Sequence, residues 1–245
     1  MKKAFLVLFL ILSGCAQKAA LRPVTVIKPS VVCPLDRNLS QCRVNHQSAN
    51  IVLIYNRNEA NELVSAATGF VVDEDGLIMT AKHVVEEPSV KTFVMVIDGK
   101  TLVIRRVQRN FVSPSHDVAI FKIDYKFRRI IQFMTGELIA GESLYAIGFP
   151  LTQSKSILGI ILHNRLPYVY GSGEYTLERE DWQLSTIYVA PGYSGAPIFD
   201  YEGRAVGIVI ASVRFTPIGN IFTLSVASRH CAALIATVKK FFEKK

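Results

Sequence analysis

The chain has 245 residues, of which half are apolar, so it is long enough for one large domain or two small ones with a sizeable core. Its formal net charge is +8, from 28 lysines and arginines against 20 aspartates and glutamates. These basic residues are scattered, with no zinc-ligand spacing, stacking motif or recognition-helix pattern beside them. The composition therefore argues against nucleic acid as a partner and favours a solvated basic surface, compatible with anionic lipid headgroups.

The first fifteen residues have the pattern of an export signal. A positive start precedes an unbroken apolar run at residues 4–12, which is too short to span a membrane, since a span needs about 20 residues. The run ends in Leu12-Ser13-Gly14-Cys15, which resembles the bacterial lipobox, although an ordinary signal peptide with an incidental cysteine is the alternative. The resemblance implies a lipoprotein signal peptide at residues 1–14 and a lipid on Cys15. With Ala16 as the next residue, it implies a bacterial envelope protein at the periplasmic face of the outer membrane.

Residues 15–49 are predicted to be the lipidated N-terminus and a tether, because prolines and basic residues occur at its start without any periodicity. Besides Cys15, the chain has Cys33, Cys42 and Cys231, and none of them has metal-ligating neighbours. In an oxidising compartment one disulfide is expected, and both a Cys33–Cys42 loop and a pairing with Cys231 fit the sequence. We expect no metal site and no cofactor.

From residue 50 onward the chain shows short apolar runs with turn signals between them, the pattern of antiparallel β-barrels or a sandwich. The Asp73-Glu74-Asp75-Gly76 turn gives the strongest hairpin signal. Only the end is predicted to be helical, with Ser228 as N-cap and apolar side chains recurring on one face. The predicted strands are residues 51–55, 68–72, 77–80, 93–97, 102–107, 118–123, 143–148, 157–162, 182–189, 205–210 and 220–225.

Three residues occur in contexts that suit catalysis. His83 follows an apolar strand, and Asp117 precedes a run apolar enough to be buried, where a carboxylate needs a partner. Ser194 lies in the turn Pro191-Gly192-Tyr193-Ser194-Gly195-Ala196-Pro197, where its hydroxyl is accessible and backbone amides are free, as acyl transfer requires. Taken singly, a plain turn or a surface histidine explains each of them. His116 is predicted to be only a neighbour, because consecutive strand residues point to opposite faces.

In this order the residues resemble those of the chymotrypsin-fold (trypsin-like) serine proteases, closest to the bacterial HtrA/Deg branch. The resemblance covers roughly residues 50–230. An α/β-hydrolase is excluded, because its acid and histidine would follow the serine. The segments that carry the resemblance are Thr68-Gly69-Phe70-Val71-Val72 with Thr80-Ala81-Lys82-His83-Val84-Val85, His116-Asp117-Val118-Ala119-Ile120-Phe121-Lys122, Tyr145-Ala146-Ile147-Gly148-Phe149-Pro150, and the Ser194 turn with Gly203 and Val206-Gly207-Ile208.

The resemblance implies an all-β fold of two six-stranded antiparallel β-barrels, at about residues 50–135 and 140–226, with a C-terminal α-helix at about residues 228–243. The protease domain as a whole would span residues 50–245. The same resemblance implies a serine endopeptidase acting on envelope proteins or peptides, with His83 as general base, Asp117 orienting it and Ser194 as nucleophile.

The resemblance also implies an oxyanion hole from the backbone amides of Gly192, Tyr193 and Ser194. It implies that Ile208, Val209 and Ile210 line the substrate pocket. Because this strand has no acidic residue, we expect a small or medium apolar residue before the scissile bond rather than arginine or lysine.

Two departures from the family pattern lie in the Ser194 turn. Tyr193 replaces the aspartate that pairs with a freed N-terminus in zymogens, which argues against activation by proteolysis. Ala196 replaces a glycine, which matters if that backbone needs a positive φ. Many HtrA relatives carry PDZ domains, and none is expected here. The alternatives are a catalytically inactive protease-fold module that binds peptides or partner proteins at the membrane, and a basic lipoprotein with only a structural role.

Overall fold

The structure is a computed structural model that describes residues 46–98, 101–107, 109–150, 169–178, 182–215 and 220–243. Several sequence predictions lie outside the described residues. They are the signal peptide at residues 1–14, the lipidated Cys15, the cysteines Cys33 and Cys42, and the strand at residues 157–162.

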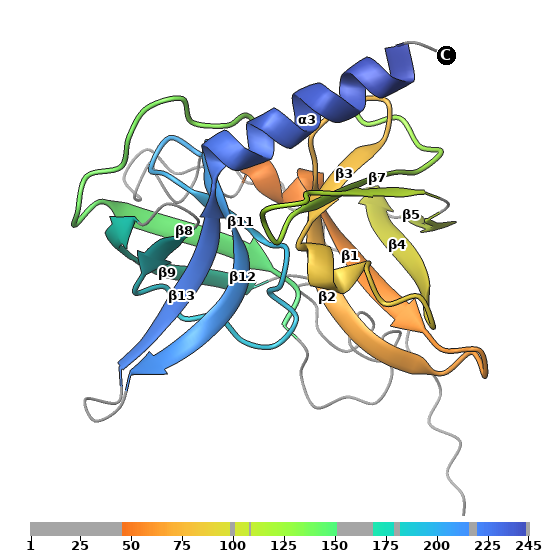
Figure 1. The fold of residues 1–245 in the computed structure, drawn as a ribbon, viewed down its shortest axis with the longest axis horizontal. Coiled ribbons are helices and arrows are strands. Elements are labelled where there is room, and N and C mark those ends of the chain that lie inside the picture. Colours follow the sequence, from red (N-terminus) through yellow and green to blue (C-terminus); the bar gives the residue numbers. More distant parts are fainter. Residues whose placement is uncertain are drawn as a thin grey trace, which may run out of the picture.

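The first half of the described chain is a curled antiparallel sheet of seven strands in the order β5-β4-β1-β2-β3-β7-β6 (Figure 1). Its two edge strands follow one another in the chain, because β5 ends at Arg106 and β6 begins at Asn110. Strand β5 pairs with β4 and strand β6 pairs with β7, so the two together take the place of one strand of the predicted six-stranded barrel. The strands are β1 Ile51–Arg57, β2 Leu63–Val71, β3 Leu77–Thr80, β4 Lys91–Asp98, β5 Thr101–Arg106, β6 Asn110–Val112 and β7 Ala119–Lys122, with 3-10 turns η1 Gln47–Asn50 and η2 Lys82–Val84.

The second half is a closed six-stranded barrel in the order β10-β13-β12-β11-β8-β9, and all its pairs are antiparallel. A closed barrel, a curled sheet and a terminal helix confirm the predicted chymotrypsin-like, all-β class. The strands are β8 Ser143–Gly148, β9 Val169–Glu178, β10 Gln183–Ser185, β11 Pro197–Phe199, β12 Ala205–Phe215 and β13 Asn220–Ala227.

Strand β9 was not predicted, because two glycines dilute its apolar pattern. The structure shows why a glycine is needed there: an added Cβ on Gly173 would lie 2.5 Å from the backbone nitrogen of Ile187. The chain after β10 crosses β9 closely at this point. Strand β10, Gln183–Ser185, is shorter than the strand predicted at residues 182–189.

The two halves bury their strands on both faces, which gives one core inside each half and a third between them. Strand β1 shows the alternation, because Val52 and Ile54 pack inside the first half while Ile51 and Leu53 belong to the shared core. The shared core joins residues of both halves, including Phe70, Met79, Ile147, Phe149, Phe199 and Ile208. Apolar packing therefore fixes the orientation of one half against the other.

Helix α3, Ser228–Glu243, lies across both halves (Figure 1). At its start Ser228 Oγ donates to the carbonyl of Met134 at 3.2 Å, and near its end Lys239 Nζ lies 2.6 Å from Asp73 Oδ2. Cys231 is a free cysteine buried beneath it, where desolvation raises the pKa of the thiol to about 12. Within the described residues, no helix is long and apolar enough to cross a membrane.

Candidate active site

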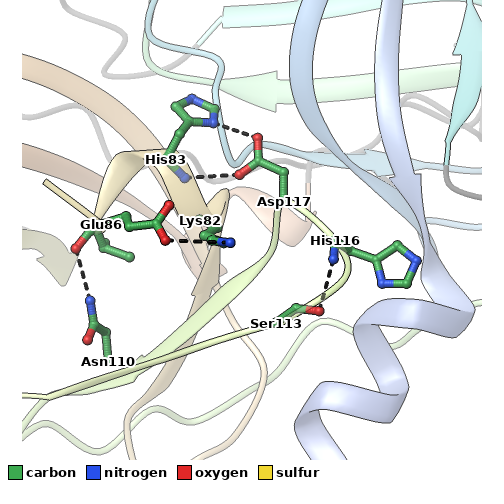
Figure 2. A network of polar contacts seen from close by, with 8 residues as sticks. Lys82, His83, Glu86, Asn110, Ser113, His116 and Asp117 are labelled. Carbon is green, nitrogen blue, oxygen red and sulfur yellow. Dashed lines mark hydrogen bonds and ion pairs between the residues drawn. The ribbon is translucent and has the colours of Figure 1, made fainter.

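His83 and Asp117 meet at one end of two paired strands. Strand β3 runs into the η2 turn that carries His83, and β7 begins two residues after Asp117, with Thr80 opposite Ala119. His83 Nδ1 lies 2.7 Å from Asp117 Oδ2, and the backbone amide of His83 donates to Asp117 Oδ1 at 2.9 Å (Figure 2). Both carboxylate oxygens are therefore used to orient one histidine.

The protonation of this pair follows from its contacts. Burial raises the pKa of Asp117, but the hydrogen bonds from the His83 ring and from the His83 backbone outweigh it, so the pKa falls below its usual value. An ionised carboxylate only accepts hydrogen bonds, so Nδ1 of His83 carries a proton and Nε2 is left as the basic nitrogen. The imidazole is 47% exposed, which leaves Nε2 accessible.

The turn that carries His83 is held by side chains from neighbouring strands. Asn56 Nδ2 donates to the carbonyl of Val84 at 2.8 Å in a buried contact, and Asn110 Nδ2 donates to the carbonyl of Val85 at 2.9 Å. These bonds satisfy carbonyls that a single 3-10 turn leaves without backbone partners. The imidazole consequently sits on a fixed backbone.

His116 is directed away from this pair, although it lies in a bend before β7 and not in a strand, as the prediction assumed. Its ring stacks on His230 of helix α3, with the ring centroids 3.8 Å apart. Its amide donates to Ser113 Oγ at 3.2 Å (Figure 2). Asp117 and His116 therefore face opposite sides of the same segment, one toward His83 and the other toward the helix.

The turn that carries Ser194 takes its shape from two glycines with positive φ, +101° at Gly192 and +83° at Gly195. It is fastened to strand β12 by two hydrogen bonds, from the Gly195 amide to the carbonyl of Val209 at 2.8 Å and from the Val209 amide to the carbonyl of Ala196 at 2.9 Å. Ser194 is half-buried. Ser194 is thus the more accessible residue of a turn whose neighbours Tyr193 and Ala196 are buried.

The three amides predicted to hold an oxyanion differ in their hydrogen bonding. The amide of Tyr193 donates to the carbonyl of Ala190 at 3.1 Å. In the part of the chain that the structure describes, the amides of Gly192 and Ser194 have no acceptor. The amides of Gly192 and Ser194, one on each side of the bonded Tyr193 amide, are therefore a pair of donors for a ligand oxygen.

Thr68 of β2 links the Ser194 turn to the first half. It was not among the predicted site residues. Its amide donates to the carbonyl of Ser194 at 2.9 Å, and its Oγ1 donates to the carbonyl of Gly192 at 2.7 Å. The same Oγ1 accepts from the amide of Phe149 at 2.9 Å. Thr68 is fully buried. A threonine inside an apolar run was the available signal, because a buried hydroxyl needs partners.

Gly195 shows how closely the two halves approach. An added Cβ there would lie 2.2 Å from the Thr68 carbonyl and from Thr80 Oγ1, and 2.9 Å from the amide of Ala81. Ala81 precedes the η2 turn that carries His83. The nucleophile turn therefore rests against the strand end that leads into the histidine.

The two departures from the family pattern are packing features. Tyr193 is 3% exposed in the core of the second half, where it lies against Gly148, and burial raises its pKa to about 12. Ala196 is fully buried and does not have a positive φ, since Asn61 is the single described non-glycine residue that does. The alanine therefore imposes no backbone strain on the turn.

The residues predicted to line a substrate pocket have different surroundings. Ile208 lies in the core shared by the two halves and Val209 in the core of the second half, both almost fully buried. Ile210 is half-buried and sits at a β-bulge between Val209 and Ala211. Of the three, Ile210 is thus the one with an accessible side chain.

Among the described residues, no group of three His, Cys, Asp or Glu side chains is placed to hold a metal ion.

This geometry is that of a chymotrypsin-like protein, in which a curled sheet carries a histidine and an aspartate and a closed barrel carries a serine turn that rests against that sheet. Residues 67–208 match the family model of the trypsin-like peptidase domain. The match covers more than half of the chain, and the chain belongs to this family.

Proteins with similar sequences are named as serine endoproteases. A probable periplasmic serine endoprotease DegP-like of Chlamydia muridarum is 30% identical over 60% of this chain and 28% of its own length. The protein of the same name from Halomonas elongata is 30% identical over 69% of this chain and 33% of its own length. The chain thus matches about a third of these relatives or less.

Among solved structures, the serine endoprotease from Yersinia pestis superposes with a TM-score of 0.65 at 20% identity, covering 83% of this chain and 67% of that one. Deg5 superposes with a TM-score of 0.61 at 17% identity, covering 79% and 91%. At these identities the two structures support the fold.

Proposed function

We propose that the chain is a serine endopeptidase that cleaves peptide bonds through an acyl-enzyme, with His83, Asp117 and Ser194 as its catalytic residues. The observation that carries this proposal is the double hydrogen bond between His83 and Asp117, next to a serine turn with two free amides. Membership of the trypsin-like peptidase family and the endoprotease relatives support it.

In the proposed mechanism, Nε2 of His83 takes the proton of Ser194 Oγ while Oγ attacks the scissile carbonyl carbon. The amides of Gly192 and Ser194 stabilise the oxyanion of the tetrahedral intermediate. The carboxylate of Asp117 stabilises the imidazolium, which then protonates the leaving amine. A water molecule, activated by His83 in the same way, releases the acid product and regenerates Ser194.

We propose protein or peptide substrates with a small or medium apolar residue before the cleaved bond. Ile210, which is accessible beside the Ser194 turn, is the apolar side chain that supports this preference. The relatives are named periplasmic, which supports a periplasmic location here. Lipidation of Cys15 and attachment to the outer membrane rest on the lipobox-like sequence.

Labelling of the purified chain with a fluorophosphonate tests the proposal, because this reagent reacts with an activated serine. We expect wild type to be labelled and to cleave a protein substrate, and Ser194→Ala and His83→Ala to lose on the order of 10⁶ in turnover. Ser89→Ala is the matched control, since this exposed serine forms hydrogen bonds with Glu87 alone among the described residues. A folded wild-type protein that is neither labelled nor active would contradict the proposal and favour an inactive binding module.

A further inference from the structure

A basic cavity lies at the end of the first half where strands β5 and β7 meet the C-terminal end of helix α3. Its volume is about 760 Å³. Two carboxylates, those of Asp75 and Asp124, also lie on its wall. The side chains that give the cavity its character are Arg105, Arg106, Arg109, Lys122, Lys126 and Phe242.

This cavity is separate from the candidate active site. Lys122 lies opposite Leu77 at one end of the β3–β7 pair, whereas Thr80 and Ala119 lie at the other end, next to the catalytic residues. Asp117 and Lys122 are five residues apart, which is about 16 Å along an extended strand. The proposed protease chemistry therefore does not account for the charge gathered here.

Most of these cations form no ion pair with another described residue, although the charge of Lys122 helps to lower the pKa of Asp73. Lys126 pairs with Asp75 at 3.3 Å. Within the described ranges, no carboxylate lies within ion-pair distance of Arg105, Arg106, Arg109 or Lys122. Unneutralised like charges around one cavity repel each other, so a bound anion would relieve that repulsion.

Three of the cations are nevertheless fixed in place by contacts that leave their charge available. Arg105 Nε donates to the carbonyl of Asp124 at 2.9 Å, and its Nη1 donates to the carbonyl of Ile104 at 3.1 Å. The guanidinium of Arg109 lies 4.5 Å from the ring centre of Phe241, and Lys122 Nζ lies 4.7 Å from that of Phe242. Aromatic rings hold a cation without neutralising it. Such preorganisation lowers the entropy that a ligand must overcome.

We propose that this cavity is a binding site for a phosphate-bearing anion, either a small soluble polyphosphate or the headgroup of an anionic phospholipid. Guanidinium groups bind phosphate oxygens through two parallel hydrogen bonds, and a lysine adds a point charge. Three arginines and two lysines around one cavity match an anion with more than one charge. The site is independent of the protease activity proposed above, because binding needs neither Ser194 nor His83.

Calorimetry of the full-length chain with inorganic triphosphate tests the site, and vesicles of phosphatidylcholine with or without phosphatidylglycerol distinguish the two sources. Arg106→Gln is the test variant, since Arg106 is exposed and its side chain forms no hydrogen bond, ion pair or ring contact among the described residues. Arg214→Gln is the control, because Arg214 is also exposed but lies on β12 in the other half. Both variants remove one positive charge and keep the apolar N-terminal run.

We expect triphosphate to bind wild type and Arg214→Gln alike, and to bind Arg106→Gln about tenfold more weakly, as the loss of one charge-assisted hydrogen bond predicts. Triphosphate binding alone identifies a soluble anion as the ligand. Additional binding to phosphatidylglycerol vesicles that Arg106→Gln weakens identifies the lipid headgroup. The proposal is overturned if neither probe binds, or if the two variants lose binding equally, because the effect is then one of overall charge.

Discussion

The two halves of the molecule contribute to the candidate active site in different ways. The first half supplies His83 and Asp117 from the ends of two neighbouring strands, already joined by two hydrogen bonds. The second half supplies Ser194 from a turn between β10 and β11, whose shape depends on the positive φ of Gly192 and Gly195. His83 and Asp117 are thus placed by sheet pairing, and Ser194 by a turn.

This difference shows where the alignment of the site is vulnerable. The His83–Asp117 contact lies within one sheet and needs nothing from the other half. The serine turn, by contrast, is held against the first half by two hydrogen bonds of Thr68 and by the close approach at Gly195. Changes in the first half should therefore affect acid–base chemistry alone, whereas changes at the contact should also affect stability.

Among the changes that compare the two halves, the largest effect is expected from Asp117→Asn, which removes the charge of the carboxylate but keeps the shape of the side chain. The amide side chain favours the wrong imidazole tautomer, and we expect turnover to fall about 10⁴-fold, as in other triads of this kind. Steady-state kinetics and thermal unfolding measure the two effects separately. Glu59→Gln, which neutralises another exposed carboxylate, is the control. A loss of less than tenfold would show that His83 does not depend on Asp117.

Gly195→Ala tests the close approach of the two halves. A methyl group would lie 2.2 Å from two oxygen atoms of the first half, on a backbone with φ of +83°. We expect the free energy of unfolding to fall by about 3 kcal/mol or more, from overpacking added to left-handed strain.

Gly141→Ala is the matched control for that variant, because Gly141 has a φ of +90° but nothing within 4 Å of an added Cβ. The strain alone predicts a loss of about 1–2 kcal/mol. Urea unfolding of both variants gives the comparison. Equal losses would mean that the contact between the halves is not tight at Gly195.

Thr68→Val removes the hydroxyl that joins β2 to the serine turn and keeps the shape of the side chain. The Phe149 amide would lose its acceptor in a buried place, which costs about 1–3 kcal/mol of stability. Because Gly192 is also released, we expect turnover to fall about 10²-fold. Thr68→Ser keeps the hydroxyl and should retain most of the activity. If Thr68→Val were as active as wild type, this link would not position the turn.

The smallest effect is expected from Lys239→Ala, which removes the ion pair between helix α3 and Asp73 in the first half. Burial raises the pKa of Asp73, but the contacts with Lys239 and with the Asp75 amide outweigh it, and the pKa is lowered. A lowered carboxyl pKa contributes stability that is present above the usual value of about 4 and is lost as the pH falls through the folded-state value.

We therefore expect the unfolding free energy of wild type to exceed that of Lys239→Ala by about 0.2–1 kcal/mol at pH 7, because the pair is partly exposed. The difference should shrink as the pH falls below about 4 and vanish below the lowered pKa of Asp73. Unfolding free energies at several pH values measure it. A difference that stayed constant down to acid pH would show that packing of the lysine chain, and not the ion pair, accounts for it.

The sequence by itself determined the class of fold and the candidate residues. Short apolar runs, the turn at Asp73–Gly76 and the order of His83, Asp117 and Ser194 can all be read from the sequence without coordinates. The helix that the pattern predicted from Ser228 corresponds to α3, Ser228–Glu243. Strand β9 was not predicted from the sequence, because Gly173, which the close approach of Ile187 requires, weakens its apolar pattern.

Only the tertiary structure decided which polar groups meet. Thr68 and Gly192 are far apart in the chain, and nothing local shows that one donates to the other. The same holds for the occupied amide of Tyr193 and the buried positions of Ile208 and Val209, since burial depends on what the other half places against them. The physical reason is that local pattern fixes how a segment folds, whereas hydrogen bonding and burial depend on packing between segments distant in sequence.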